Sequence, residues 1–174
     1  QRRVPVSLDA PVFTLTHAMG FKGVLGGEYN FNRTEASIWK RFWLPASWGK
    51  IDCSVKAGAE WNTVPFPLLI LPEANLSYIT QRETFCLINN MEFLNDRFAS
   101  MSISYDMNGK LFNRIPLLKN LKWREMFRVR ALWGTLTDKN NPFKSSNPDL
   151  FRFPTRDGKF TSFVMDPKVP YVEA

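Results

Sequence analysis

The stretch from Lys50 to Trp61 alternates apolar residues with polar or glycine residues without a break. Because side chains of a strand point in turn to its two faces, every apolar residue of this stretch lies on one face. A period of two residues predicts a β-strand and not a helix. Strands of soluble proteins usually have about five to six residues, whereas a tilted strand that crosses a bilayer needs about nine to eleven. The chain is therefore expected to fold with unusually long strands.

The same alternation recurs at other places, with turn signals between them. Arg97 to Met107 and Trp123 to Trp133 are two further well-patterned strands, and Asn108-Gly109 is typical of a hairpin turn. Further strands are expected at residues 12–19, 21–31, 36–44, 84–93 and 159–165. No stretch has a convincing helical period. The sequence predicts an all-β, antiparallel meander of about seven or eight long strands.

Connections of unequal length separate these strands, with long loops expected near 62–83 and 137–155. Unequal connections are typical of membrane barrels, which have short turns on one side and long loops on the other. In the first long loop, Pro65, Pro67 and Pro72 flank the apolar run 68–71, and proline cannot donate to a sheet ladder. Two interpretations remain open for this run: a loop packed under the sheet, or a plug. Residues 1–174 are interpreted as one partial barrel domain, a fragment of a longer protein.

The net charge is +7, from 23 basic and 16 acidic residues spread along the chain. Such an excess suggests an anionic neighbour, such as lipopolysaccharide, nucleic acid or an acidic ligand, although a solvated basic surface is equally compatible with it. Two cysteines permit one disulfide without requiring it. No run of eighteen apolar residues is present, which excludes a transmembrane helix.

Periodicity alone does not distinguish a membrane barrel from a soluble one, because an apolar row can face either lipid or a core. Trp123 and Trp133 lie ten residues apart on one predicted face, about 33 Å along a strand. Tilted by about 45°, this length projects to roughly 24 Å, close to the apolar band between the two aromatic girdles of an outer-membrane barrel. The expected girdle residues are Trp61, Trp123 and Trp133.

The polar rows of the same strands carry charged side chains. Facing lipid, an Arg or Lys costs about 2 to 4 kcal/mol at the bilayer midplane, so these rows are expected to face a polar, net basic lumen. The candidate lumen-facing residues are Lys50, Asp52, Lys56, Glu60, Arg124, Arg128 and Arg130. Their mixed signs suggest ion pairs between strands, and a selective pathway is the alternative role.

Enzymatic chemistry is not expected, and no catalytic, cofactor-binding or metal-binding residues are predicted. The single histidine, His17, would have to serve any Ser-His or Cys-His mechanism, and it cannot complete a usual zinc site with two distant cysteines. Nucleic-acid binding is not expected either, because Phe127 and Arg128 fall on opposite faces of their strand. The alternative to a membrane barrel is a soluble β-barrel or sandwich that binds an anionic ligand, lipid or single-stranded nucleic acid.

Residues 89–140, from NNMEFLNDRF to GTLTDKN, together with GVLGGEYNF and VPFPLLILPEANLSY, carry a family resemblance. The chain resembles outer-membrane proteins of Bacteroidota, a family of unknown function that often has an N-terminal carboxypeptidase-regulatory-like domain. FLNDRF and FNRIPLL are also distantly similar to strands of protein-insertase and two-partner-secretion barrels, although the insertases' arginine-containing loop motif is not visible.

The family resemblance implies a C-terminal β-barrel in the bacterial outer membrane. The expected role is non-enzymatic, in transport or outer-membrane assembly. The expected partners are outer-membrane lipid and lipopolysaccharide, and either the missing strands of the same barrel or a partner chain.

Overall fold

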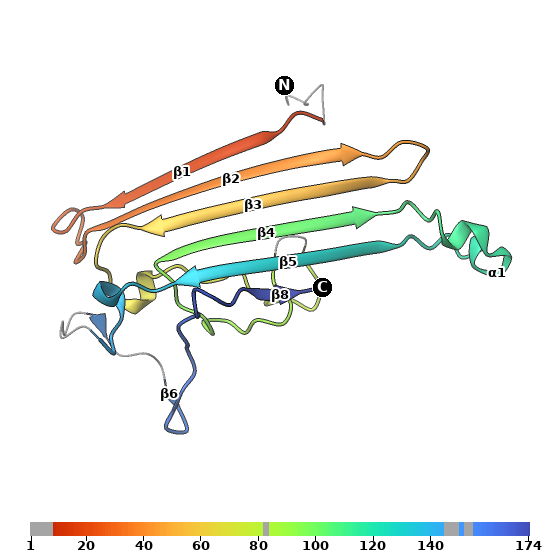
Figure 1. Ribbon diagram of the computed structural model, residues 1–174. Helices are drawn as coiled ribbons and strands as arrows, with labels where there is room; N and C mark the ends of the chain where they lie inside the picture. Colours follow the sequence, from red (N-terminus) through yellow and green to blue (C-terminus); the bar gives the residue numbers. More distant parts are fainter. Residues whose placement is uncertain (1–8, 82–83, 145–149, 152–154) are drawn as a thin grey trace.

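The computed structural model describes residues 9–81, 84–144, 150–151 and 155–174. Its centre is one six-stranded antiparallel sheet in which five strands follow one another as a meander (Figure 1). In the order of the sheet, the strands are β1 (Val12–Gly20), β2 (Phe31–Trp43), β3 (Lys50–Glu60), β4 (Arg97–Asp106), β5 (Met126–Thr135) and β8 (Tyr171–Glu173). The expectation of an all-β, antiparallel meander with long strands is confirmed, but five long strands lie in the described residues where about seven or eight were expected.

The remaining elements are short. A two-stranded hairpin pairs β6 (Thr155–Arg156) with β7 (Lys159–Phe160). The helical turns are η1 (Phe66–Leu68), η2 (Phe112–Arg114), α1 (Pro116–Lys119) and η3 (Asp138–Asn140). Within the described ranges, none of the helices has the length and apolar character needed to cross a membrane.

The register of the strands separates most of the two predicted kinds of row, although Lys40 pairs with Cys53 and Arg97 with Ala59 in the apolar rows, and Trp39 lies in the polar rows. Val55 of β3 is paired with Ile38 of β2 and Met101 of β4, whereas the next residue, Ser54, is paired with Trp39 and Ser102. Because paired residues on neighbouring strands point to the same face, the sheet has one apolar face and one polar face. We use the terms apolar face and polar face for these two surfaces.

Several boundaries differ from those expected from sequence. Residues 21–30 form the turn between β1 and β2, where Gly23 and Gly26 have positive φ, and so they are not a strand. The segment 84–93 belongs to a connection and contributes only isolated bridges, at Phe85 and Phe93. Of the expected strand 159–165, only β7 is formed. Residues 84–93 and 159–165 contain consecutive apolar residues instead of a strict alternation, and no strand of the main sheet pairs with them.

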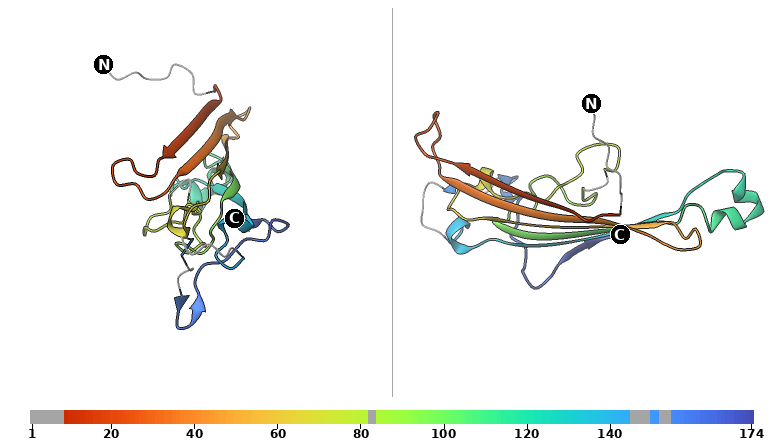
Figure 2. Two further views of the ribbon diagram at one scale, coloured as in Figure 1. Left: turned by 90° about the vertical axis from the view of Figure 1, so that its left-hand side faces the viewer. Right: turned by 90° about the horizontal axis from the view of Figure 1, so that it is seen from above.

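The strand expected at 123–133 begins at Met126, three residues later than predicted. Asn108 and Gly109 do adopt the left-handed conformations of a tight turn. However, the ladder closes only where the Met107 N–H donates to the Glu125 carbonyl at 3.1 Å. The turn therefore opens a longer connection, residues 107–125, which projects beyond the ends of the strands (Figures 1 and 2).

The long connection between β3 and β4, residues 61–96, folds back onto the polar face. Its apolar side chains form two buried clusters there, together with residues of β5 and of the segment after β5. The first cluster contains Val64, Leu69, Leu94 and Leu136, and the second contains Phe85, Ile88, Leu132 and Met165. Seen along the sheet, the long strands form a single curved layer and part of this connection rises from one side of it (Figure 2). The connection is longer than the expected 62–83 loop, and it includes the apolar run 68–71.

The second expected loop, 137–155, lies in the connection between β5 and β8. Residues 145–149 and 152–154 of it fall outside the described residues. Near its start, η3 packs against the end of the sheet through Asn140, which is fully buried. The last strand of the sheet, β8, pairs with β5 from Arg130 to Leu132.

Candidate functional site

The polar face gathers charged residues from five strands, β2, β3, β4, β5 and β8. Of the candidates expected to face a lumen, six lie on this face: Lys50, Asp52, Lys56 and Glu60 on β3, and Arg128 and Arg130 on β5. Arg124 precedes β5 and lies in the connection 107–125. The structure therefore brings six of the seven together on one surface and leaves Arg124 outside it.

Most charges at the end of the polar face near the β2–β3 turn are neutralised by a neighbour. Arg41 donates through Nε and Nη2 to the two carboxylate oxygens of Asp52, at 2.6 and 3.0 Å. Beside them, Lys50 Nζ lies 3.8 Å from Asp106 Oδ2. The strands place on this face six basic residues, Arg33, Arg41, Lys50, Lys56, Arg128 and Arg130, and five acidic ones, Glu35, Asp52, Glu60, Asp106 and Glu173. The polar face is therefore close to neutral, and it carries much less of the positive charge than expected.

A buried ion pair fastens the connection 61–96 to the sheet. Arg130 of β5 and Glu173 of β8 are only 3% and 7% exposed, and Arg130 Nη1 lies 3.0 Å from Glu173 Oε1. Glu173 also accepts hydrogen bonds from the backbone N–H groups of Cys86 and Leu87, at 3.0 and 3.1 Å. We call this arrangement the latch.

Arg130 also binds the connection directly. Its guanidinium donates to the carbonyl oxygen of Gln81 at 3.1 Å and also to the carbonyl oxygen of Thr84. A buried charge is tolerated only when it is paired and its hydrogen-bonding capacity is used. The two side chains thus hold the connection against the polar face mainly through backbone groups of Gln81, Thr84, Cys86 and Leu87.

Two further contacts tie the connection down. Glu73 forms an ion pair with Lys56 of β3, and this pair is partly exposed. At the other end of the sheet, the fully buried Asp96 accepts hydrogen bonds from Thr137 and, at 3.1 Å, from Asn140 Nδ2. Asn140 Oδ1 in turn accepts from the Val64 N–H at 2.9 Å. Polar side chains therefore fix both the start and the middle of the connection.

A polar groove of about 290 Å³ lies between this connection and the β2–β3 turn. Four serines line its floor, and five basic and three acidic side chains lie around them. The lining includes Trp39, Arg41, Lys50, Asp52, Ser54, Lys56, Glu73, Phe85, Ser100, Ser102, Ser104, Asp106, Arg128 and Arg130. A second groove, of about 310 Å³, runs under the apolar run 68–71 and shares Glu73 and Phe85 with the first. The connection thus fills part of the polar face and leaves water-accessible space on either side of Glu73.

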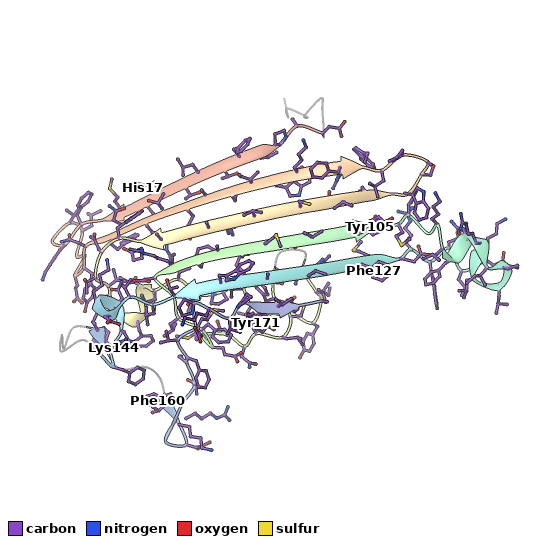
Figure 3. All side chains as sticks on the ribbon, viewed as in Figure 1. His17, Tyr105, Phe127, Lys144, Phe160 and Tyr171 are labelled. Atoms are coloured by element: carbon purple, nitrogen blue, oxygen red, sulfur yellow. The ribbon has the colours of Figure 1, made fainter. Side chains whose placement is uncertain are left out.

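Among the described residues, the apolar face carries no such cover. Phe13 and Leu15 are 70% and 74% exposed, and Val55, near the middle of the sheet, is 45% exposed. At the end near the β2–β3 turn, Tyr105 and Phe127 lie side by side on β4 and β5 (Figure 3). The sheet buries its charged side and leaves its apolar side open, which is the reverse of a soluble sheet packed on a core.

The three tryptophans expected in a girdle lie in different settings. Trp133 lies on the apolar face of β5, and Trp61 follows β3 at the same end, where Nε1 donates to Thr34 Oγ1 at 3.0 Å. His17 of β1 contacts the same hydroxyl, at 2.9 Å (Figure 3). Trp123 lies in the connection 107–125, so its spacing from Trp133 is not a distance along one strand.

Sequence reasoning did not find Glu73 or Glu173. Neither belongs to a long alternating row, and each meets its basic partner only through the fold. The one available signal for Glu173 was the segment PYVEA, in which Tyr171 and Glu173 share a face of a short strand. The two cysteines are free: Cys53 lies on the apolar face, and Cys86 lies in the connection over the polar face. Among the described residues, no group of three or more His, Cys, Asp or Glu is placed to hold a metal ion.

Residues 1–144 match the model described as the C-terminal domain of the family of unknown function DUF5686. The chain belongs to the DUF5686 family. The match covers β1 to β5, the connection 61–96 and the connection 107–125. No curated protein matches, and no solved structure matches.

Proposed function

We propose that this DUF5686 domain forms part of the wall of a β-barrel in the bacterial outer membrane, with its apolar face toward lipid and its polar face toward an aqueous lumen. The observation that carries this proposal is the inverted packing of the sheet. The connection 61–96 packs on the charged face, whereas the apolar face lies open. In a soluble protein the covering segments lie on the apolar side of the sheet.

The size of the open face supports the same proposal. Five strands spaced by about 4.8 Å, each about 30 Å long, present roughly 700 Å². Soluble monomers rarely expose apolar patches larger than about 300 to 600 Å². The eleven residues of β3 extend about 36 Å and, tilted by about 45°, project to about 26 Å, which matches the apolar band of outer-membrane barrels.

Closure of the barrel needs further strands. In the described part of the chain, the outer edge of β1 has no partner strand, and β5 from Met126 to Val129 has none on the side of β8. Open sheet edges do not occur within the hydrocarbon region of a membrane, because their backbone groups find no water there. The partner is therefore additional strands of the same barrel or of a partner chain.

The role of this barrel is non-enzymatic, in transport, and the connection 61–96 narrows the pathway. The polar groove beside Glu73 gives the pathway a floor of serine hydroxyls and paired charges. A lumen of this kind favours hydrophilic solutes. A role in outer-membrane assembly is the second candidate, supported by the unpartnered edges that can pair with an incoming strand.

The test compares two adjacent residues of β3 as a matched pair. It uses the full natural protein, carrying Cys86→Ser and reconstituted in lipid bilayers. One nitroxide label is placed on the natural Cys53. In a second protein the label is placed at position 54, through Ser54→Cys combined with Cys53→Ser. The label at 53 is expected to collide mainly with oxygen, which concentrates in lipid, and the label at 54 mainly with a water-soluble nickel chelate. Equal access of the nickel chelate to both labels would show that no lipid covers the apolar face.

A further inference from the structure

The net positive charge of the chain gathers in one place. Residues 107–125 contain five basic residues, Lys110, Arg114, Lys119, Lys122 and Arg124, and one acidic residue, Glu125. This net charge of +4 is more than half of the +7 of the whole chain. The expectation that the excess is spread along the sequence is therefore wrong. The polar face of the sheet is nearly neutral, so this connection and not the lumen is the basic part of the domain.

The same connection exposes apolar side chains. Leu117 is 81% exposed, Leu121 is 51% exposed and Trp123 is 56% exposed. They alternate with the basic residues around η2 and α1, none of whose residues is buried. Within the described chain, Arg114, Lys119, Lys122 and Arg124 form no ion pair with an acidic residue. Exposed leucine and tryptophan beside basic side chains are typical of segments that lie in a membrane interface.

The connection nevertheless has a defined structure. The buried carboxylate of Glu125 accepts a hydrogen bond from the Phe112 N–H at 2.5 Å, so the only acidic side chain is turned inward. The rings of Phe112 and Trp123 pack edge to face at 6.3 Å. Lys110 Nζ donates to the Ala46 carbonyl at 2.7 Å and lies over the Trp48 ring. The β2–β3 turn thus supports the base of the connection.

The connection 107–125 lies next to a row of aromatic side chains. It continues from the end of the sheet where Phe42, Tyr105 and Phe127 lie in one row on the apolar face. In an outer-membrane barrel, aromatic rows mark the level of the lipid headgroups. Residues just beyond such a row lie at the depth of the phosphate groups.

We propose that the connection 107–125 is a membrane-surface anchor that binds anionic lipid headgroups at this rim of the barrel, with Arg114, Lys119 and Lys122 meeting phosphates and Leu117 and Leu121 entering the interface. This inference rests on the proposed function, because it needs the apolar face in lipid. It adds a lipid-selective contact that the barrel wall itself does not require. Each basic residue near an anionic surface contributes about 1 kcal/mol, so three together give about a hundredfold preference for anionic over neutral lipid.

The experiment places an environment-sensitive fluorophore at Leu117→Cys, in the full protein with Cys53→Ser and Cys86→Ser. The protein is reconstituted in vesicles of phosphatidylcholine with and without phosphatidylglycerol. The emission at position 117 is expected to shift to shorter wavelength only with the anionic lipid, and the Lys119→Glu, Lys122→Glu variant is expected to lose this shift. A fluorophore at Leu25→Cys, which is fully exposed but lies at the other end of the sheet, is the control and is expected to respond equally in both lipids.

Emission typical of water at position 117 in both lipids would overturn the anchor, and would leave an acidic protein partner as the ligand of the connection. An equal shift in both lipids would overturn headgroup selectivity. The separate protein that carries the nitroxide at Cys53, measured in membranes of the same composition, distinguishes these results from a failure of the proposed function. A lipid-exposed Cys53 with a water-exposed position 117 rejects the anchor alone, whereas a water-exposed Cys53 rejects both.

Discussion

At the scale of single residues, the domain depends on a few buried polar groups on the polar face. Arg130 and Glu173 are the clearest case, since each is almost fully buried and together they bind backbone groups of Gln81, Cys86 and Leu87. Removing one member of a buried pair leaves the other charge without compensation. Removing one partner of the latch is therefore expected to cost more stability than removing one partner of a surface ion pair.

We expect Glu173→Ala to lower the free energy of unfolding by about 3 to 5 kcal/mol, because it strands the buried Arg130 guanidinium and two backbone N–H groups. The control is Asp138→Ala, which removes the exposed pair with Lys144 and is expected to cost less than about 1 kcal/mol. Both are measured by urea unfolding in detergent. Equal losses for the two variants would contradict the latch.

Glycine is required at the β2–β3 turn. Gly49 has φ of +90°, and a Cβ atom there would collide with the Asp106 carbonyl oxygen. We expect Gly49→Ala to cost about 2 to 4 kcal/mol of stability. The matched control is Gly26→Ala, which has φ of +82° but open space around it, and is expected to cost about 1 kcal/mol. The difference in urea midpoint between the two variants isolates the collision from the backbone strain.

At the scale of elements, the connection 61–96 is held unevenly. Its first part is fixed by the cluster around Val64 and by Asn140, and Cys86 and Leu87 are fixed by the latch. Between them, Glu73 is tied by the partly exposed pair with Lys56 and by a backbone hydrogen bond from the Phe85 N–H. Segments with few buried contacts open most readily. The exposed residues 76–80 are therefore the part of the connection that can move without unfolding the sheet.

We expect Glu73→Lys to increase the reaction of a water-soluble thiol reagent with Ser102→Cys on the groove floor, in protein that lacks Cys53 and Cys86. The rate is expected to rise up to about fivefold, since a partly exposed ion pair contributes at most about 1 kcal/mol. Asp138→Lys, far from the groove, is the control. An unchanged rate in the Glu73 variant would show that this ion pair does not restrict access to the groove.

The elements also show what local pattern can predict. The strands β1 to β5 were each expected from alternation, because an antiparallel sheet with two different faces imposes that period on its sequence. Residues 84–93 were also expected as a strand, from a weaker pattern, but they fold over the polar face, where the isolated bridges of Phe85 and Phe93 take the place of a ladder. Alternation indicates an extended backbone, and only the neighbouring strands decide whether it joins a sheet.

At the scale of the whole molecule, the two faces of the sheet have opposite requirements. In a membrane, a cation on the apolar face loses hydration, whereas one on the polar face stays in water. We expect Val55→Lys to lower stability in bilayers by about 2 to 4 kcal/mol, and the adjacent Ser54→Lys to change it by less than about 1 kcal/mol. Folding titrations in lipid vesicles measure both. A Val55→Lys protein as stable as the parent would contradict contact between this face and lipid.

The sequence by itself determined the long strands, their antiparallel order and which residues share a face, because these depend on a two-residue period along the chain. It also placed six charged residues on one surface correctly. Only the tertiary structure decided that the connection 61–96 lies on the charged face, that Glu73 and Glu173 complete ion pairs there, and that the excess positive charge stands apart on 107–125. Those features depend on contacts between residues far apart in sequence and on which charges neutralise one another, and neither is encoded in a local period.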